Sequence, residues 1–158
     1  MQVIKFIIPL IFGILFISNS YALDCNRTIS AALTSQLDCE NSDSLTVNSG
    51  VVLNFNNNDA VNASNTDEVT IVNSGTIEHS VDEKQSVING SATRNLTITN
   101  NGIINSTKKY GVYIEDAEQV TITNNAGATI HTTYGGGTAS AELGAIYGDN
   151  IGNCASGD

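Results

Sequence analysis

A short motif returns four times along the chain, and this internal repeat limits the possible folds more than any other feature. The motif reads LTVNSG at residues 45–50 and VTIVNSG at 69–75, then LTITNNG at 96–102 and VTITNNAG at 120–127. Its copies begin 24, 27 and 24 residues apart. A regular period of this size is typical of solenoids, in which each repeat is stable only when stacked on its neighbours.

Each repeat holds three short β-prone pieces. Apolar residues alternate with Thr or Asn inside each piece, and a period of two indicates a strand with one buried face. A second piece follows the Asn-containing turn, and a third ends the repeat, as at residues 111–114 and 145–147. We therefore predict an all-β fold, a right-handed parallel β-helix with three strands per turn and about four turns. The expected inward columns are Leu45/Val69/Leu96/Val120, Val47/Ile71/Ile98/Ile122, Leu53/Ile77/Ile104/Ile130 and Val61/Val87/Val112/Ile146.

An asparagine stands at the first corner of each repeat, shortly before a glycine. Asn tolerates the left-handed backbone of a tight corner, and its amide can hydrogen-bond to its counterpart one turn away. We therefore predict a structural ladder at this corner. Its members would be Asn48, Asn73, Asn100 and Asn124.

The sequence before the repeats predicts export. Lys5 precedes an apolar run at residues 6–17, and small residues lead up to Ala22, so residues 1–22 are interpreted as a secretory signal peptide. Residues 23–44 do not match the repeat and are interpreted as an N-terminal cap. Residues 45–158 would form the β-helix repeats, which are incomplete at the C-terminal end.

The three cysteines are interpreted in the oxidising environment that export implies. Cys25 and Cys39 are 14 positions apart and are candidates for a disulfide, which leaves Cys154 without an identified partner. A metal site is disfavoured because His79 and His131 are distant in sequence from these thiols and belong to non-adjacent repeats. No cofactor is expected.

Composition excludes two further classes. The chain contains 20 Asn, 16 Thr and 14 Gly, residues that are poor in helix interiors, so a helical bundle is disfavoured. The formal net charge of −10 would repel a phosphate backbone, so nucleic acid is not an expected partner.

The signal peptide, the cap and the copies of V-T-I-x-N-x-G-x-I together resemble the N-terminal part of an autotransporter passenger domain. That family is exported through type V secretion by Gram-negative bacteria. The resemblance implies a location at the cell surface or outer membrane or outside the cell, and a non-enzymatic role in adhesion or surface display. The implied partner is an unidentified extracellular ligand, such as a host surface, a glycan or another cell. The resemblance also implies a C-terminal β-barrel translocator in the full-length product, for which the residues after Asn150 are too few.

Two alternatives have sequence support. A polysaccharide lyase or hydrolase would need a pair of carboxylates, and the best local group is Glu115, Asp116 and Glu118, to which the next repeat adds Asp149. We interpret this group as a solvated acidic corner and do not expect an enzyme.

The second alternative is an ice-binding solenoid. Outward threonines in two adjacent repeats would form a flat array that is similar to the binding face of such proteins. Asn48 and Val72 would interrupt the array in the other repeats. The array consists of Thr97, Thr99, Thr121 and Thr123.

Overall fold

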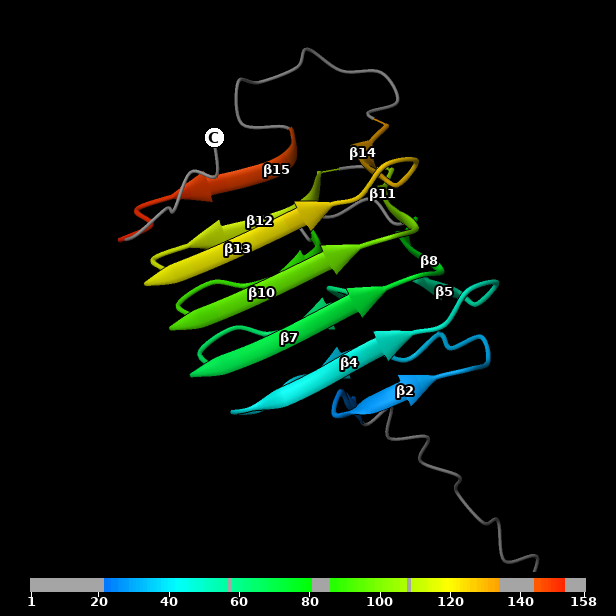
Figure 1. The fold of residues 1–158 in the computed structure, drawn as a ribbon, viewed down its shortest axis with the longest axis horizontal. Coiled ribbons are helices and arrows are strands. Elements are labelled where there is room, and N and C mark those ends of the chain that lie inside the picture. The colour runs from blue at the N-terminus through cyan, green and yellow to red at the C-terminus, as the bar shows by residue number, and fades with distance from the viewer. Residues whose placement is uncertain (1–21, 57, 81–85, 108, 134–143, 153–158) are drawn as a thin grey trace, which may run out of the picture.

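The chain winds into a stack of β-coils (Figure 1). The computed structural model describes residues 22–56, 58–80, 86–107, 109–133 and 144–152. The predicted signal peptide, apart from Ala22, and Cys154 lie outside these residues. Within the described ranges, no helix has the length and apolarity needed to cross a membrane.

The described residues form fifteen strands in three parallel sheets, which we call A, B and C. Sheet A contains, in spatial order, β1 (Leu23–Asp24), β3 (Leu37–Asp38), β6 (Val61–Asn62), β9 (Ser86–Asn89), β12 (Tyr110–Glu115) and β15 (Gly144–Asp149). Sheet B contains β2 (Arg27–Ile29), β4 (Asp43–Val47), β7 (Glu68–Asn73), β10 (Asn95–Asn100) and β13 (Gln119–Asn124). Sheet C contains β5 (Val52–Phe55), β8 (Thr76–His79), β11 (Ile103–Ser106) and β14 (Thr129–Thr132).

The chain visits sheets A, B and C in turn, and each strand pairs with its equivalent in the next coil. Figure 1 shows this for sheet B, whose strands lie side by side in chain order from β2 to β13. The alternating Val, Ile and Thr residues suit such strands because one face is buried and the other faces water. The predicted all-β parallel β-helix is confirmed.

The buried face of each strand builds one continuous aliphatic core. In sheet C the predicted column is observed, because Leu53, Ile77, Ile104 and Ile130 are register partners. In sheet B, Ile98 lies between Ile71 and Ile122 as predicted.

Both predicted sheet B columns are wrong in the first repeat, where Val47, expected opposite Ile71, lies opposite Asn73. Leu45 pairs with Ile71 rather than Val69, and Asp43 takes the place opposite Val69. The corner after β4 spans residues 48–51, whereas only residues 74 and 75 separate β7 from β8. Alignment on the shared Asn-Ser-Gly letters therefore displaces the strand before them by two positions.

Sheet A also differs in one column. Ile88, not Val87, is the register partner of both Val61 and Val112. Val87 and Ile88 are consecutive and both fully buried, so β9 does not alternate between buried and exposed side chains at this point. A strict alternation could not reveal which of the two pairs with the neighbouring coils.

The segment expected to cap the core belongs to the coil itself. Strand β1 pairs with β3, β2 pairs with β4, and an isolated parallel bridge joins Leu33 to Leu53. Residues 23–38 therefore contribute to all three sheets. This segment covers the N-terminal side of the core while continuing the same coil.

At each corner from sheet A to sheet B after β3, one residue adopts a left-handed backbone. The amide of Asn65 donates to the carbonyl of Ser91, and that of Ala92 to Glu115, so this corner is hydrogen-bonded from coil to coil. The left-handed residues at this corner are Ser42, Asn65, Ala92, Asp116 and Asn150.

Candidate functional site

The corner asparagines form a buried ladder at the ends of the sheet B strands. The Asn73 amide nitrogen donates to Asn100 Oδ1 at 2.8 Å, and the Asn100 amide nitrogen donates to Asn124 Oδ1 at 2.8 Å. Asn73 and Asn100 are fully buried. Each also bonds to the backbone of the sheet C strand in the next coil: Asn73 donates to the Ile103 carbonyl and Asn100 to the Thr129 carbonyl. The ladder is therefore a structural element that joins sheet B to sheet C.

Asn48 is not a member of the ladder. Val47 lies opposite Asn73, and Asn48 falls in the longer corner where its side chain is exposed. The ladder asparagines also do not have the left-handed backbone that was expected of them. In the longer corners that backbone belongs to Gly50 and Gly127, where φ is 78° and 84°.

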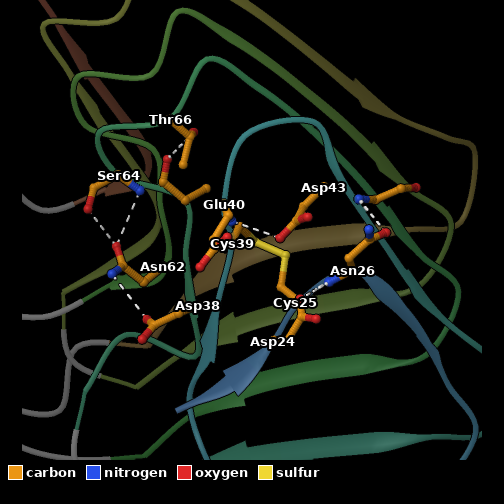
Figure 2. Close-up of a disulfide and its surroundings, with 12 residues drawn as sticks. Asp24, Cys25, Asn26, Asp38, Cys39, Glu40, Asp43, Asn62, Ser64 and Thr66 are labelled. Carbon is orange, nitrogen blue, oxygen red and sulfur yellow. Dashed lines mark hydrogen bonds between the residues drawn. A yellow bond between two sulfur atoms is a disulfide. The ribbon is translucent and has the colours of Figure 1, made fainter.

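The Cys25–Cys39 disulfide joins two successive coils (Figure 2). Each cysteine directly follows a sheet A strand, and the residues before them, Asp24 and Asp38, are register partners. Both cysteines are buried. The sequence-predicted bond is thus present and links the first coil to the second.

Short polar contacts surround the disulfide in Figure 2. The Asn62 amide donates to Asp38, and the Ser64 hydroxyl donates to Asn62 Oδ1 at 2.7 Å. The Asp43 carboxylate accepts the backbone amide of Glu40 at 2.7 Å. These groups satisfy one another within the corner, which is typical of a structural role.

A cluster of aromatic and acidic side chains lies on sheet A, and we call it the tyrosine–carboxylate cluster. It consists of Tyr110, Tyr113, Tyr147, Glu115 and Asp149. The three ring centroids are 5.1 to 5.2 Å apart, and the rings of Tyr113 and Tyr147 are nearly parallel, at 7°. These are all the tyrosines among the described residues, and they come from two neighbouring strands, β12 and β15.

Tyr110 forms the buried base of this cluster, with 3% of its surface exposed, while Tyr113 and Tyr147 are half-buried. The Lys109 ammonium lies 4.5 Å from the Tyr110 ring centroid, within the range of a cation–π contact. The sequence analysis missed this cluster. The signal was present, since GVYI at residues 111–114 and AIY at 145–147 place a tyrosine at equivalent positions of two repeats.

Two acidic residues of the cluster lie on adjacent strands. Glu115 and Asp149 are register partners, so their Cα atoms are about 4.8 Å apart. The Tyr113 hydroxyl donates to Glu115 at 2.5 Å. This hydrogen bond to a carboxylate, together with burial and the nearby negative charge, raises the pKa of Tyr113 well above its usual value of 10.0. Tyr113 therefore remains a neutral donor at physiological pH.

The other acidic candidates point to different partners. Asp116 accepts a hydrogen bond from Asn150 in the next coil. Glu118 lies 3.7 Å from Arg94, which also contacts Asp67 at 3.3 Å, and all three side chains are more than half exposed. Such exposed pairs contribute little to stability. The structure thus separates Glu118 from the tyrosine–carboxylate cluster.

The two histidines occupy different environments. His79 is buried in the column between Phe55 and Ser106, whereas His131 pairs with Asn105 and is exposed. Burial lowers the pKa of His79, partly opposed by Asp59 and the backbone of Asn58, and neither ring nitrogen makes a well-formed hydrogen bond. Over the described ranges, no group of three or more His, Cys, Asp or Glu side chains is placed to hold a metal ion.

The outer face of sheet B carries two columns of small hydroxyl residues, which we call the hydroxyl face. The observed register aligns Thr46 with Val72 and Thr99, so the place that the sequence analysis gave to Asn48 is held by a threonine. Ser44 joins the second column opposite Thr70. The two columns are Thr28/Thr46/Val72/Thr99/Thr123 and Ser44/Thr70/Thr97/Thr121.

Comparisons with known protein families, with curated proteins and with solved structures found nothing that matches this chain.

Proposed function

We propose that this chain is an exported, non-enzymatic β-solenoid that attaches to an extracellular ligand through its lateral surface. It would serve as the passenger part of an autotransporter-like protein at the surface of a Gram-negative bacterium. The observation that carries the adhesive role is the tyrosine–carboxylate cluster. Tyrosine is enriched at the centres of protein binding surfaces because its large ring adds contact area at low entropic cost and its hydroxyl offers a hydrogen bond.

The shape of the molecule supports this proposal. Residues 110 and 147 are far apart in sequence, yet the coil brings their rings to 5.1 Å. The strands that carry them are fixed by pairing on sheet A, so a ligand would not have to order a flexible loop when it binds. The ligand class that the resemblance suggests, a glycan or another cell, offers hydroxyl groups to the carboxylates and apolar ring faces to the tyrosines.

The Cys25–Cys39 disulfide supports the proposed export, because such bonds form and persist in oxidising compartments. The test is to express the full chain in a Gram-negative host, with and without residues 1–22, and to fractionate the cells. We expect the full chain outside the cytoplasm with both thiols oxidised. Recovery of the full chain in the cytoplasm as a free dithiol would contradict export.

The adhesive role is tested with fluorescently labelled protein on a glycan array and on cultured epithelial cells. Tyr113→Ala should reduce binding several-fold because it removes one ring and the donor to Glu115. Thr76→Ala on sheet C is the matched control and should bind like wild type. Binding that is absent from both surfaces, or that Tyr113→Ala leaves unchanged, would contradict the proposed role.

A second candidate function has one specific observation in its favour. The register pairs Glu115 with Asp149 on adjacent strands, so that two carboxylate-bearing residues have Cα atoms about 4.8 Å apart, and glycosidases use a pair of nearby carboxylates. Release of reducing ends from pectin or xylan is the test. Activity that disappears in Glu115→Gln, with binding retained, would favour the enzyme, and no release by wild type would exclude it for these substrates.

A further inference from the structure

We propose that the hydroxyl face of sheet B binds ice. This inference concerns a different surface from the tyrosine–carboxylate cluster and does not depend on the function proposed above. Its basis is the observed register, which extends the threonine array beyond the four residues visible in the sequence. Eight hydroxyl side chains share the face, in one column that crosses five strands and a second that crosses four.

The hydroxyl groups of this face are available to a ligand. Among the described residues, no hydrogen bond to another protein group uses the side-chain oxygen of any of the eight. Thr97, Thr121 and Thr123 are exposed, and Thr70 and Thr99 are half-buried by their neighbours in the array. Nearby polar residues do have partners, as Asn100 does in the ladder behind the face. Within the described residues, the eight hydroxyls of this face therefore have no protein partner to lose when a ligand binds.

The array is regular in two directions. Neighbouring hydroxyls in one column are separated by the strand spacing of about 4.8 Å, and the two columns by two residues along a strand, about 6.6 Å. The β-branched threonine side chain has few rotamers, so the backbone largely fixes each hydroxyl and methyl group. A rigid array with two fixed repeats suits a ligand that is itself a lattice with similar repeats.

The charge of the hydroxyl face indicates which kind of lattice it would bind. The chain carries a net charge of −10, yet neither column contains a charged residue. The hydroxyl face is thus neutral on an acidic molecule, and ice is a neutral lattice of hydrogen-bond donors and acceptors that hydroxyl groups can join. Val72 interrupts one column but has the shape of threonine, so it preserves the flat surface while omitting one hydroxyl.

A crystalline polysaccharide is the competing occupant, since it also repeats hydroxyl groups. Recognition of sugar rings draws on large flat contact surfaces, which aromatic side chains supply. The two columns contain only Thr, Ser and Val, and the described tyrosines lie on sheet A. The side chains of the hydroxyl face are therefore better suited to water than to sugar rings.

The test measures thermal hysteresis and incorporation into a growing ice hemisphere, using the full chain exported and purified in its disulfide-bonded form. Wild type should show both. Thr97→Leu should reduce hysteresis several-fold, and Val72→Thr, which completes the column, should maintain or increase it. Thr76→Leu on sheet C is the matched control and should behave like wild type. Circular dichroism and the Tm of each variant verify that the fold is retained.

Three results would overturn the inference. The first is a folded wild-type protein with no hysteresis and no incorporation into ice. The second is hysteresis that Thr97→Leu leaves unchanged. The third is binding to microcrystalline cellulose that Thr97→Leu abolishes while ice is unaffected, which would assign the hydroxyl face to a polysaccharide.

Discussion

Replacing Asn100 with alanine tests the energetic role of the buried ladder. The side chain donates to Asn124 Oδ1 and to the Thr129 carbonyl, and it accepts from the Asn73 amide at 2.8 Å. Alanine leaves one buried N–H of Asn73 and the Thr129 carbonyl without these partners. A buried polar group that loses its partner costs about 1–3 kcal/mol. We therefore expect Asn100→Ala to lower the free energy of unfolding by about 3 kcal/mol.

Asn124→Ala is the matched control, because Asn124 occupies the exposed end of the same ladder. Water can replace its hydrogen bonds, so this change should cost about 1 kcal/mol or less. Urea unfolding of the disulfide-bonded protein, followed by far-UV circular dichroism, measures both values. Equal and small losses in the two variants would refute the conclusion that burial makes the ladder important.

Three further predictions follow from the fold. Reduction of the Cys25–Cys39 bond, with a separation of 14 residues, should lower the free energy of unfolding by about 3 kcal/mol in urea titrations, and an unchanged midpoint would contradict this. Gly102→Ala should destabilise the coil more than Gly127→Ala in thermal melts, because a Cβ at Gly102 would lie 2.0 Å from a backbone oxygen. At Gly127 a Cβ would meet no heavy atom within 4 Å and would only strain the left-handed backbone, where φ is 84°. Burial lowers the pKa of His79 in the folded chain below its ordinary value of 6.5. As the pH falls below 6.5, the His79 side chain therefore binds a proton in the unfolded chain more readily than in the folded chain. Stability should therefore be fully present above that pH and fall as the pH drops below it, and unfolding curves of His79→Leu should lack this part of the acid loss.

The positions of the strands were predictable from the sequence because similar apolar residues recur at the core positions of successive repeats. Ile71, Ile98 and Ile122 each follow a β-branched or polar outward neighbour, and that local pattern is enough to place them on one face. The prediction of the disulfide similarly needed only two cysteines close in sequence and an export signal.

The register of β4 against β7 was not predictable from the same pattern. The letters Asn-Ser-Gly occur in two corners of different length, and only the backbone distinguishes them. Gly50 has a left-handed backbone in the long corner, whereas Gly75 has a Cβ position that would lie 2.4 Å from a carbonyl oxygen of the neighbouring coil. Both corners require glycine, but for different physical reasons.

The candidate sites depend on contacts between coils, which a single repeat does not contain. Tyr113 meets Tyr147 only because β12 and β15 are neighbours, and β13 and β14 come between these two strands in the sequence. Thr46 joins Thr99 in one column only when the register is known. Local patterns therefore identify the strands, while the spatial arrangement of the sites follows from the register.

The position of the disulfide also determines how the rod would respond to mechanical tension. Hydrogen bonds between coils run along the rod, so a pull on the N-terminal end would break them a few at a time, as in a zipper. The covalent link between Cys25 and Cys39 transmits that force directly to the second coil. Residues 26–38 would thus carry no tension, and the covalent bond would prevent the first coil from unfolding under force.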